Sequence, residues 1–218
     1  KLLEMANYDY GEQDLVLEIS VKRPKTFGKG KPHVVLMDCG YKMNIVRCLV
    51  DRGAKVTVVP PNYSFDKIMG LKPDGVLVSN GPGDPEKATY AIETAKQLVE
   101  KKVPLFGICL GHQIIALACG AKTYKLKFGH RGSNQPVKEL KTGKAFITAQ
   151  NHGYAVEENV PNCLEVIHKN LNDGSVEGIR HKSSPAWSVQ WHPEGSPGPK
   201  DTEFIFNQFL EECNAKKK

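Results

Sequence analysis

The sequence predicts an α/β fold, with an open, mainly parallel sheet flanked by helices and an appended antiparallel strand layer. Two observations support this prediction. From His33 to Gly120, short apolar runs alternate with amphipathic stretches, which is typical of parallel βαβ units. After Ala121 the helical stretches give way to short strand-like pieces separated by turns, such as the Asn-Asp-Gly turn at 172–174, and this pattern favours antiparallel pairing.

The parallel part is predicted from short apolar runs that are followed by turns or helices. Gly53 and Gly120 are placed to end helices, and Pro85 suits the first turn of another. We expect strands at 33–38, 55–60, 74–80 and 103–108, and helices at 41–53, 85–102 and 110–120.

The antiparallel part is predicted from shorter pieces, followed by one closing helix at 201–213. The expected strands are 122–128, 135–140, 144–150, 154–157, 164–171, 176–181 and 186–192.

The first residues differ from the rest of the chain. "DLVLEISV" at 14–21 is interpreted as a strand, and the basic, Gly- and Pro-rich segment 22–32 as a linker. Because Lys1 is not a start methionine, we expect the chain to begin inside a longer protein. The predicted division is a linker or remnant of a missing N-terminal domain at 1–31, a main domain at 32–214, and a basic tail at 215–218.

The composition excludes several function classes. The 218 residues are 40% hydrophobic and 25% charged, and no apolar run approaches the ~20 residues of a membrane span. The net charge is +6, but no basic stripe is interleaved with aromatic residues, so we expect no nucleic-acid partner. No secretory signal is evident. We therefore expect a cytoplasmic protein with no membrane partner.

Six cysteines are present without a CxxC pair or a tight Cys/His cluster of zinc spacing. This favours free thiols in a reducing compartment. Cys109 and His112 have a CxxH spacing, but no second half-site accompanies them. We therefore expect no metal site.

Cys109 lies where a predicted buried strand turns into a helix, within the pattern G-x-C-x-G. This matches the G-x-S-x-G nucleophile elbow, with sulfur in place of oxygen. Gly107 and Gly111 allow the strand and helix to pack closely around a strained turn, and a helix N-terminus favours the thiolate form. The alternative is a buried structural cysteine, which Cys109 alone does not exclude.

Two further motifs follow strand ends. In "QWHPEG", Pro193 keeps the chain extended, so His192 and Glu194 lie on one side of it. Glu194 is thus placed to orient a His192 imidazole that faces Cys109, although a surface turn explains the tripeptide about as well. In "SNGPGDP" at 79–85, two glycines let the backbone approach a ligand, but the segment also suits a plain turn.

Together, "NGPGDP", "GICLGHQ" and "HPE" resemble class I glutamine amidotransferases of the triad type, over roughly residues 32–212. The main domain at 32–214 is therefore interpreted as a class I glutamine amidotransferase domain. The strings "RGSNQP" and "QNHGY" are similar to the glutaminase domain of carbamoyl phosphate synthetase small subunits.

The resemblance implies roles for individual residues. Cys109 would be the nucleophile, His192 the acid/base and Glu194 its orienting partner. The Leu110 and Gly83 N–H groups would form an oxyanion hole. Tyr154 stands where phenylalanine is also common. The implied glutamine-binding residues are Gly81, Gly83, Leu110, Gln113, Asn151, Gly153 and Tyr154.

The implied activity is hydrolysis of the glutamine side-chain amide through a cysteine thioester. Ammonia would pass to a carbamoyl phosphate synthetase large subunit for pyrimidine or arginine biosynthesis. ATP, Mg²⁺ and bicarbonate are expected on that partner, and no cofactor in this chain. A serine of the family's N-terminal domain, expected to touch glutamine, has no match here. The alternatives are an amidotransferase component of another complex, such as anthranilate or GMP synthesis, a stand-alone γ-glutamyl hydrolase, or a non-catalytic assembly module.

Overall fold

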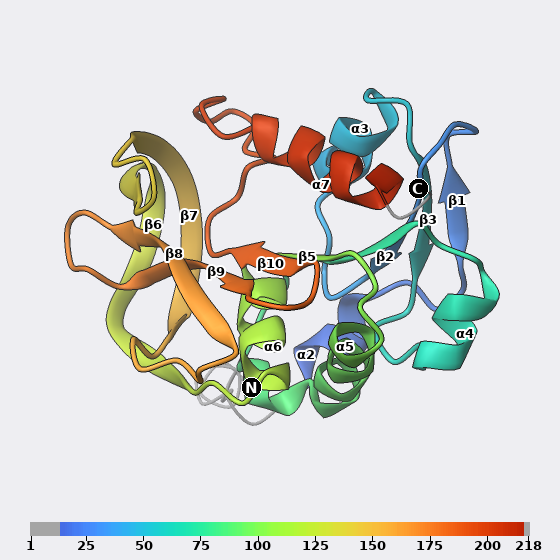
Figure 1. The fold of residues 1–218 in the computed structure, drawn as a ribbon, viewed down its shortest axis with the longest axis horizontal. Coiled ribbons are helices and arrows are strands. Elements are labelled where there is room, and N and C mark those ends of the chain that lie inside the picture. Colours follow the sequence, from blue (N-terminus) through green and yellow to red (C-terminus); the bar gives the residue numbers. More distant parts are fainter. Residues whose placement is uncertain (1–13, 216–218) are drawn as a thin grey trace, which may run out of the picture.

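The computed structural model describes residues 14–215, which fold around one ten-stranded mixed sheet (Figure 1). The strand order is β1-β3-β2-β4-β5-β10-β9-β7-β6-β8. The strands are β1 (Lys25–Phe27), β2 (His33–Met37), β3 (Lys55–Val59), β4 (Gly75–Val78), β5 (Leu105–Ile108), β6 (Thr123–Glu139), β7 (Ala145–Val156), β8 (Leu164–Asn170), β9 (Val176–His181) and β10 (Ala186–Val189).

Helices cover both faces of the sheet, because side chains alternate along each strand. On β2, Val34 and Leu36 pack in one apolar cluster with α3 and α7, whereas Val35 and Met37 pack in a second cluster with α4, α5 and α6 (Figure 1). The helices are α2 (Leu15–Ile19), α3 (Met43–Val50), α4 (Phe65–Gly70), the 3₁₀ turn η1 (Pro85–Lys87), α5 (Thr89–Glu100), α6 (Leu110–Ala118) and α7 (Phe204–Ala215).

The predicted α/β class is confirmed, but the description of the sheet needs correction. Strands β3, β2, β4, β5 and β10 are neighbours in parallel. The remaining pairings are antiparallel, and β6–β9 continue the same sheet instead of forming an appended layer. Because β8 pairs with both β6 and β9, these four strands close on themselves and the sheet is not open at this end.

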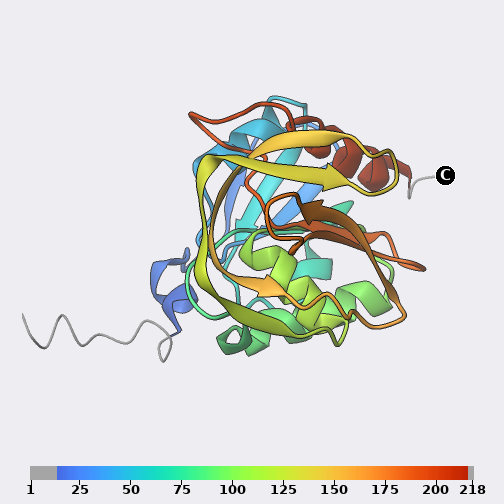
Figure 2. The same ribbon diagram turned by 90° about the vertical axis from the view of Figure 1, so that its left-hand side faces the viewer.

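Two long strands replace four of the short strands expected from the sequence. β6 and β7 run through the polar stretches that were expected to be turns, with register shifts between Lys125 and His130 and between Gly132 and Gln135. Such irregularities bend a strand without ending it. Figure 2 shows both strands, in yellow-green to gold, curving across the front of the molecule.

The N-terminal part also differs from the prediction. The segment interpreted as a strand contains helix α2, capped by Asp14, which accepts a hydrogen bond from the Leu17 N–H at 3.3 Å. Asp14 also accepts from the Tyr90 hydroxyl at 2.9 Å, so a distant residue fixes this cap. Within the expected linker, β1 pairs with β3. The predicted division at residue 31 stays a prediction, and residues 1–13 and 216–218, including most of the predicted tail, lie outside the described residues.

Other differences concern element ends. The helix predicted at 85–102 is split into η1 and α5 at Ala88, and the closing helix begins at Phe204. Helix α4 was not predicted. Among residues 14–215, no helix has both the length and the apolar character needed to cross a bilayer.

The turn between β5 and α6 depends on two glycines that let backbones touch. A Cβ at Gly107 would lie 2.5 Å from the Gly111 carbonyl oxygen, and one at Gly111 would lie 2.1 Å from the Val78 carbonyl oxygen of β4. Neither position tolerates a side chain without moving backbone. Helix α6 is therefore pressed against the carboxyl ends of β4 and β5.

We predict that Gly111→Ala destabilises the protein by about 1–3 kcal/mol or more, because the new methyl group must displace the backbone of β4. Urea unfolding measures this change. Gly70→Ala is the matched control: no atom of residues 14–215 lies within 4 Å of the added methyl at the end of α4, so its stability should be unchanged or raised by up to about 1 kcal/mol. Equal midpoints for the two variants would contradict the close contact.

Candidate active site

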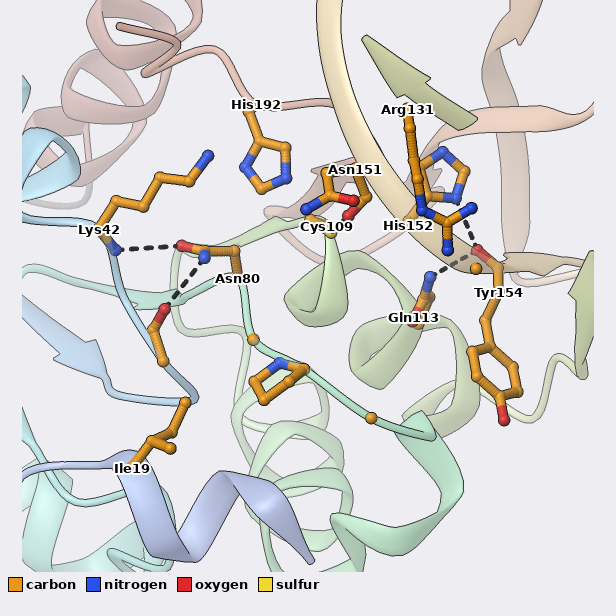
Figure 3. Close-up of a pocket in the computed structure, with 15 residues that line it drawn as sticks. Ile19, Lys42, Asn80, Cys109, Gln113, Arg131, Asn151, His152, Tyr154 and His192 are labelled. Atoms are coloured by element: carbon orange, nitrogen blue, oxygen red, sulfur yellow. Dashed lines mark hydrogen bonds between the residues drawn. The ribbon is translucent and has the colours of Figure 1, made fainter. Parts of the chain in front are cut away.

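A cavity of about 440 Å³ lies beside the carboxyl ends of the parallel strands (Figure 3). This is the edge at which open α/β sheets bind ligands. Segments from both halves of the sheet surround it: the turn after β4, the start of α6, the middle of β7 and the loop after β10. Its lining includes eight of the residues predicted from the sequence, Gly81, Gly83, Cys109, Gln113, Asn151, Gly153, Tyr154 and His192.

Cys109 occupies the sharp turn between β5 and α6. Its backbone has φ 54° and ψ −102°, a region that residues other than glycine rarely adopt. Strain of this kind costs roughly 1–3 kcal/mol and persists where the surrounding structure enforces it. The side chain is 3% exposed, and it lines the cavity at the N-terminus of α6 (Figure 3). The predicted elbow geometry is therefore present.

His192 and Glu194 form a buried pair in the loop after β10. His192 Nδ1 lies 2.7 Å from Glu194 Oε1, and the His192 ring lines the same cavity as Cys109, whose Sγ lies 3.9 Å from the Asn151 carbonyl oxygen. Burial alone would lower the pKa of His192, but Cys109 and Glu194 outweigh it and raise this pKa to about 10. The three residues predicted as nucleophile, base and orienting carboxylate thus lie together: Cys109 and His192 line one cavity, and Glu194 is hydrogen-bonded to His192.

Two residues at the start of α3 hold the loop that carries Glu194: Asn44 in the first turn of the helix, and Lys42 directly before the helix. Asn44 Nδ2 donates to the Glu194 carbonyl oxygen at 2.7 Å, and Lys42 Nζ lies 3.3 Å from Glu194 Oε1. Burial would raise the pKa of Glu194, but His192 and Lys42 lower it below its ordinary value. Glu194 is 1% exposed, so these partners keep a buried carboxylate ionised.

The predicted glutamine-binding residues form the wall opposite His192. The Gln113 side chain uses both of its N–H groups within the protein. Its Nε2 donates to the Tyr154 carbonyl oxygen at 2.8 Å and to Gln190 Oε1 at 3.0 Å. This leaves the Gln113 carbonyl oxygen as the atom that can accept from a ligand. The Tyr154 hydroxyl donates to Asp84 Oδ2 at 3.4 Å. Leu110 begins α6, whose first N–H groups have no acceptor within the helix.

Two glycines line the cavity at the turn after β4. A Cβ at Gly81 would lie 2.0 Å from the Cys39 carbonyl oxygen, so this residue packs against the turn after β2. Gly83 has φ 88°, a conformation that favours glycine. Both line the cavity, as predicted.

Several lining residues were not predicted, namely Ile19, Gly40, Lys42, Asn80, Pro82, Arg131 and His152. Asn80 holds two of them, because its side chain accepts from the Lys42 N–H at 3.3 Å and donates to the Gly40 carbonyl oxygen at 3.0 Å (Figure 3). The sequence contained a signal for the residues near Asp38. The polar, Gly-containing run that begins there follows a buried strand, and its carboxyl end lies at the edge of the sheet where the cavity is found. Ile19 gave none, because α2 was predicted as a strand.

The fold and site define the class of protein. The family described as "Glutamine amidotransferase class-I" matches residues 35–212, and the chain belongs to this family. Among solved structures, a putative GMP synthase component from Thermoplasma acidophilum has a TM-score of 0.74 with 22% identity. The match covers 85% of this chain and 95% of that one. At that identity the likeness shows the fold alone.

More similar sequences carry a narrower description. The carbamoyl phosphate synthase small chain of Rhodopirellula baltica is 57% identical over 85% of this chain and 48% of its own length. Those of Methanopyrus kandleri and Vibrio cholerae are 52% and 51% identical, covering 93% and 94% of this chain and 56% and 54% of theirs. The chain thus spans about half the length of these curated relatives.

We predict that Glu194→Gln lowers the pKa of His192 by about 1–3 units, because a neutral amide no longer favours the imidazolium. NMR titration of the His192 ring in both proteins measures the shift. Lys42→Met is the matched control of opposite sign: removing a cation beside the pair should leave the His192 pKa at or above its original value. A wild-type ring that titrates near 6.5 would contradict the charge pairing.

Proposed function

We propose that this chain hydrolyses the side-chain amide of glutamine to glutamate and ammonia. The observation that carries the proposal is the grouping of Cys109 with the hydrogen-bonded His192–Glu194 pair at one cavity, in a chain of the class I glutamine amidotransferase family. A thiol, an imidazole and a carboxylate in this order are the components of acyl transfer through a covalent intermediate.

The reaction begins when the Cys109 thiolate attacks the side-chain carbonyl carbon of glutamine. The N–H groups of Leu110 and Gly83 stabilise the oxyanion, each donor contributing roughly 3–4 kcal/mol. The imidazolium of His192 protonates the leaving nitrogen, ammonia departs, and a γ-glutamyl thioester remains. His192 then takes a proton from water, which attacks the thioester and releases glutamate and the Cys109 thiol.

The opposite wall of the cavity supplies substrate binding in this proposal. The Gln113 carbonyl oxygen, with the Asn151, Gly153 and Tyr154 segment of β7, contacts the amino and carboxylate end of glutamine. The bond from Gln113 to the Tyr154 carbonyl oxygen supports this, because it fixes the backbone of that segment against α6. The Gly81 backbone completes the site beside the thiol.

The proposed acceptor of ammonia is the large subunit of a carbamoyl phosphate synthetase. The relatives at 51–57% identity are carbamoyl phosphate synthase small chains, which supports this assignment over anthranilate or GMP synthesis. ATP, Mg²⁺ and bicarbonate would then act on the large subunit, without a cofactor in this chain. We place the reaction in the cytoplasm, and the six free cysteines agree with a reducing compartment.

We predict that Cys109→Ser lowers glutamate release from glutamine at least about a thousandfold, because loss of the nucleophile removes the covalent route. A coupled glutamate assay with the large subunit present measures it. Cys163→Ser is the matched control, since this half-buried thiol lies outside the cavity, and its turnover should be unchanged. Equal turnover in Cys109→Ser and the wild type would reject the mechanism.

The partner assignment has its own test. Adding the chain to a carbamoyl phosphate synthetase large subunit should produce carbamoyl phosphate from glutamine, bicarbonate and ATP, while Cys109→Ser should support synthesis only from added ammonia. If glutamate is released but no carbamoyl phosphate forms, the hydrolysis stands and the partner is wrong. A glutamine-analogue electrophile that fails to label Cys109 with the large subunit present would favour a non-catalytic assembly module.

A further inference from the structure

Three side chains from neighbouring antiparallel strands converge on one point in the closed part of the sheet. His130 lies on β6 directly opposite His152 on β7, and Glu177 lies on β9. One ligand atom from each, two ring nitrogens and a carboxylate oxygen, lies within 4.8 Å of the others. The expectation of no metal site rested on the spacing of residues along the sequence. These three residues are far apart in the sequence and meet through strand pairing.

The outer contacts of both rings fix their tautomers. His130 Nε2 lies 2.8 Å from Asp173 Oδ2, and His152 Nδ1 lies 2.8 Å from the Tyr154 carbonyl oxygen. Both oxygens only accept, so each of these nitrogens carries a proton. In the neutral rings, His130 Nδ1 and His152 Nε2 therefore present lone pairs, and these are the nitrogens that face Glu177 and each other.

A fourth acceptor lies between the two rings. Gln150 Oε1 is 3.0 Å from both His130 Nδ1 and His152 Nε2. Thr148 sets the orientation of this amide, because its hydroxyl donates to the Gln135 carbonyl oxygen and accepts from Gln150 Nε2 at 3.1 Å. A reversed amide would turn its oxygen toward a hydroxyl whose proton is already used. In the neutral rings, the lone pairs of His130 Nδ1 and His152 Nε2 therefore both face the Gln150 oxygen, which is itself an acceptor.

Glu177 adds a buried carboxyl group, and burial raises its pKa, so its negative charge is costly there without a nearby cation. The side chain of Glu177 is fully buried, and its Oε1 lies 3.5 Å from His130 Nδ1. Its second oxygen, Oε2, is buried and has no hydrogen-bond partner among residues 14–215. A buried carboxylate with an unsatisfied oxygen is costly unless a cation compensates it. Two lone pairs, an amide oxygen and this carboxylate together form a cation-binding environment.

We propose that His130, His152 and Glu177 bind a divalent transition metal ion of the Zn²⁺ type, with Gln150 Oε1 beside the open fourth position. Two imidazoles and a carboxylate suit zinc, and bond lengths of about 2.0–2.2 Å require the three donors to draw together by roughly an ångström. Asp173 and the Tyr154 carbonyl already make the outer hydrogen bonds that orient metal-bound histidines.

The site lies between a surface hollow and the candidate active-site cavity. His130 and Asp173 line a separate hollow of about 300 Å³, which is the side from which an ion would approach in this proposal. His152 lines the candidate active site, so one ring borders both sites. None of the three proposed ligands is Cys109, His192 or Glu194, the residues to which the proposed reaction is assigned.

The competing occupant is a proton on His130. Its hydrogen bonds to Glu177 and Asp173 outweigh burial and raise the pKa of His130 to about 9. A proton on His130 Nδ1 lets this nitrogen donate a hydrogen bond to Gln150 Oε1. His152 Nε2 then still faces the same oxygen without a proton between them. A metal ion compensates both nitrogens at once, and the two occupants exclude each other because metal binding requires His130 Nδ1 to be deprotonated.

The test is titration with Co²⁺, whose visible absorption reports tetrahedral binding, in full-length Cys109→Ser protein so that the reactive thiol does not compete. We expect one equivalent to bind, Zn²⁺ to displace it, and affinity to fall as pH decreases. Glu177→Gln and His130→Gln should abolish this binding, and Asp173→Asn, which changes a partly exposed residue, should weaken it about 10- to 100-fold.

His181→Asn is the matched control, because it removes an imidazole from the far end of β9 and should leave Co²⁺ affinity unchanged. Urea unfolding of each variant establishes that the comparison is between folded proteins. If the variants at the buried residues do not fold, the Co²⁺ affinity of Asp173→Asn is the deciding measurement. The proposal is overturned if Cys109→Ser protein binds no Co²⁺ in this way, or if binding is equally strong in Asp173→Asn or Glu177→Gln. Either result would leave a proton bridge as the occupant.

Discussion

The backbone contact between α6 and the strand ends is the constraint on which the site depends. Because Gly107 and Gly111 allow carbonyl groups to approach where a side chain would otherwise lie, the chain can reverse within one residue. That residue is Cys109, held at a positive φ. The buried strands β4 and β5 and helix α6 pack tightly around this residue, and such packing is what holds a strained backbone in place. A looser turn would leave the thiol in the core instead of at the cavity.

The rest of the site is built around that fixed sulfur by charge and by the curvature of the sheet. His192 and Glu194 are buried, and each stabilises the ionised form of the other against the cost of desolvation. Such a pair contributes orientation more than stability. The long strands β6 and β7 bring Asn151 and Tyr154 to the opposite wall, so the antiparallel half of the sheet completes a cavity that the parallel half begins.

The sequence predicted well what local pattern determines. Buried apolar runs identify the parallel strands, and the spacing of Gly107, Cys109 and Gly111 identifies the elbow. Prediction failed where distant contacts decide: α2 is a single short helix whose cap is completed by Tyr90, and β6 and β7 pass through polar residues because the two strands pair with each other there. His152, which the sequence analysis did not place at the site, lines the cavity for the same reason.

The central claim is that the sulfur of Cys109 carries the γ-glutamyl group during turnover. Acid quenching of the enzyme during steady-state hydrolysis of isotopically labelled glutamine, followed by peptide mass analysis, tests this directly. The account predicts a base-labile glutamyl adduct on the peptide containing Cys109, and its absence from Cys109→Ser protein. Label on another residue, or glutamate formation at full rate with no adduct at any quench time, would contradict it.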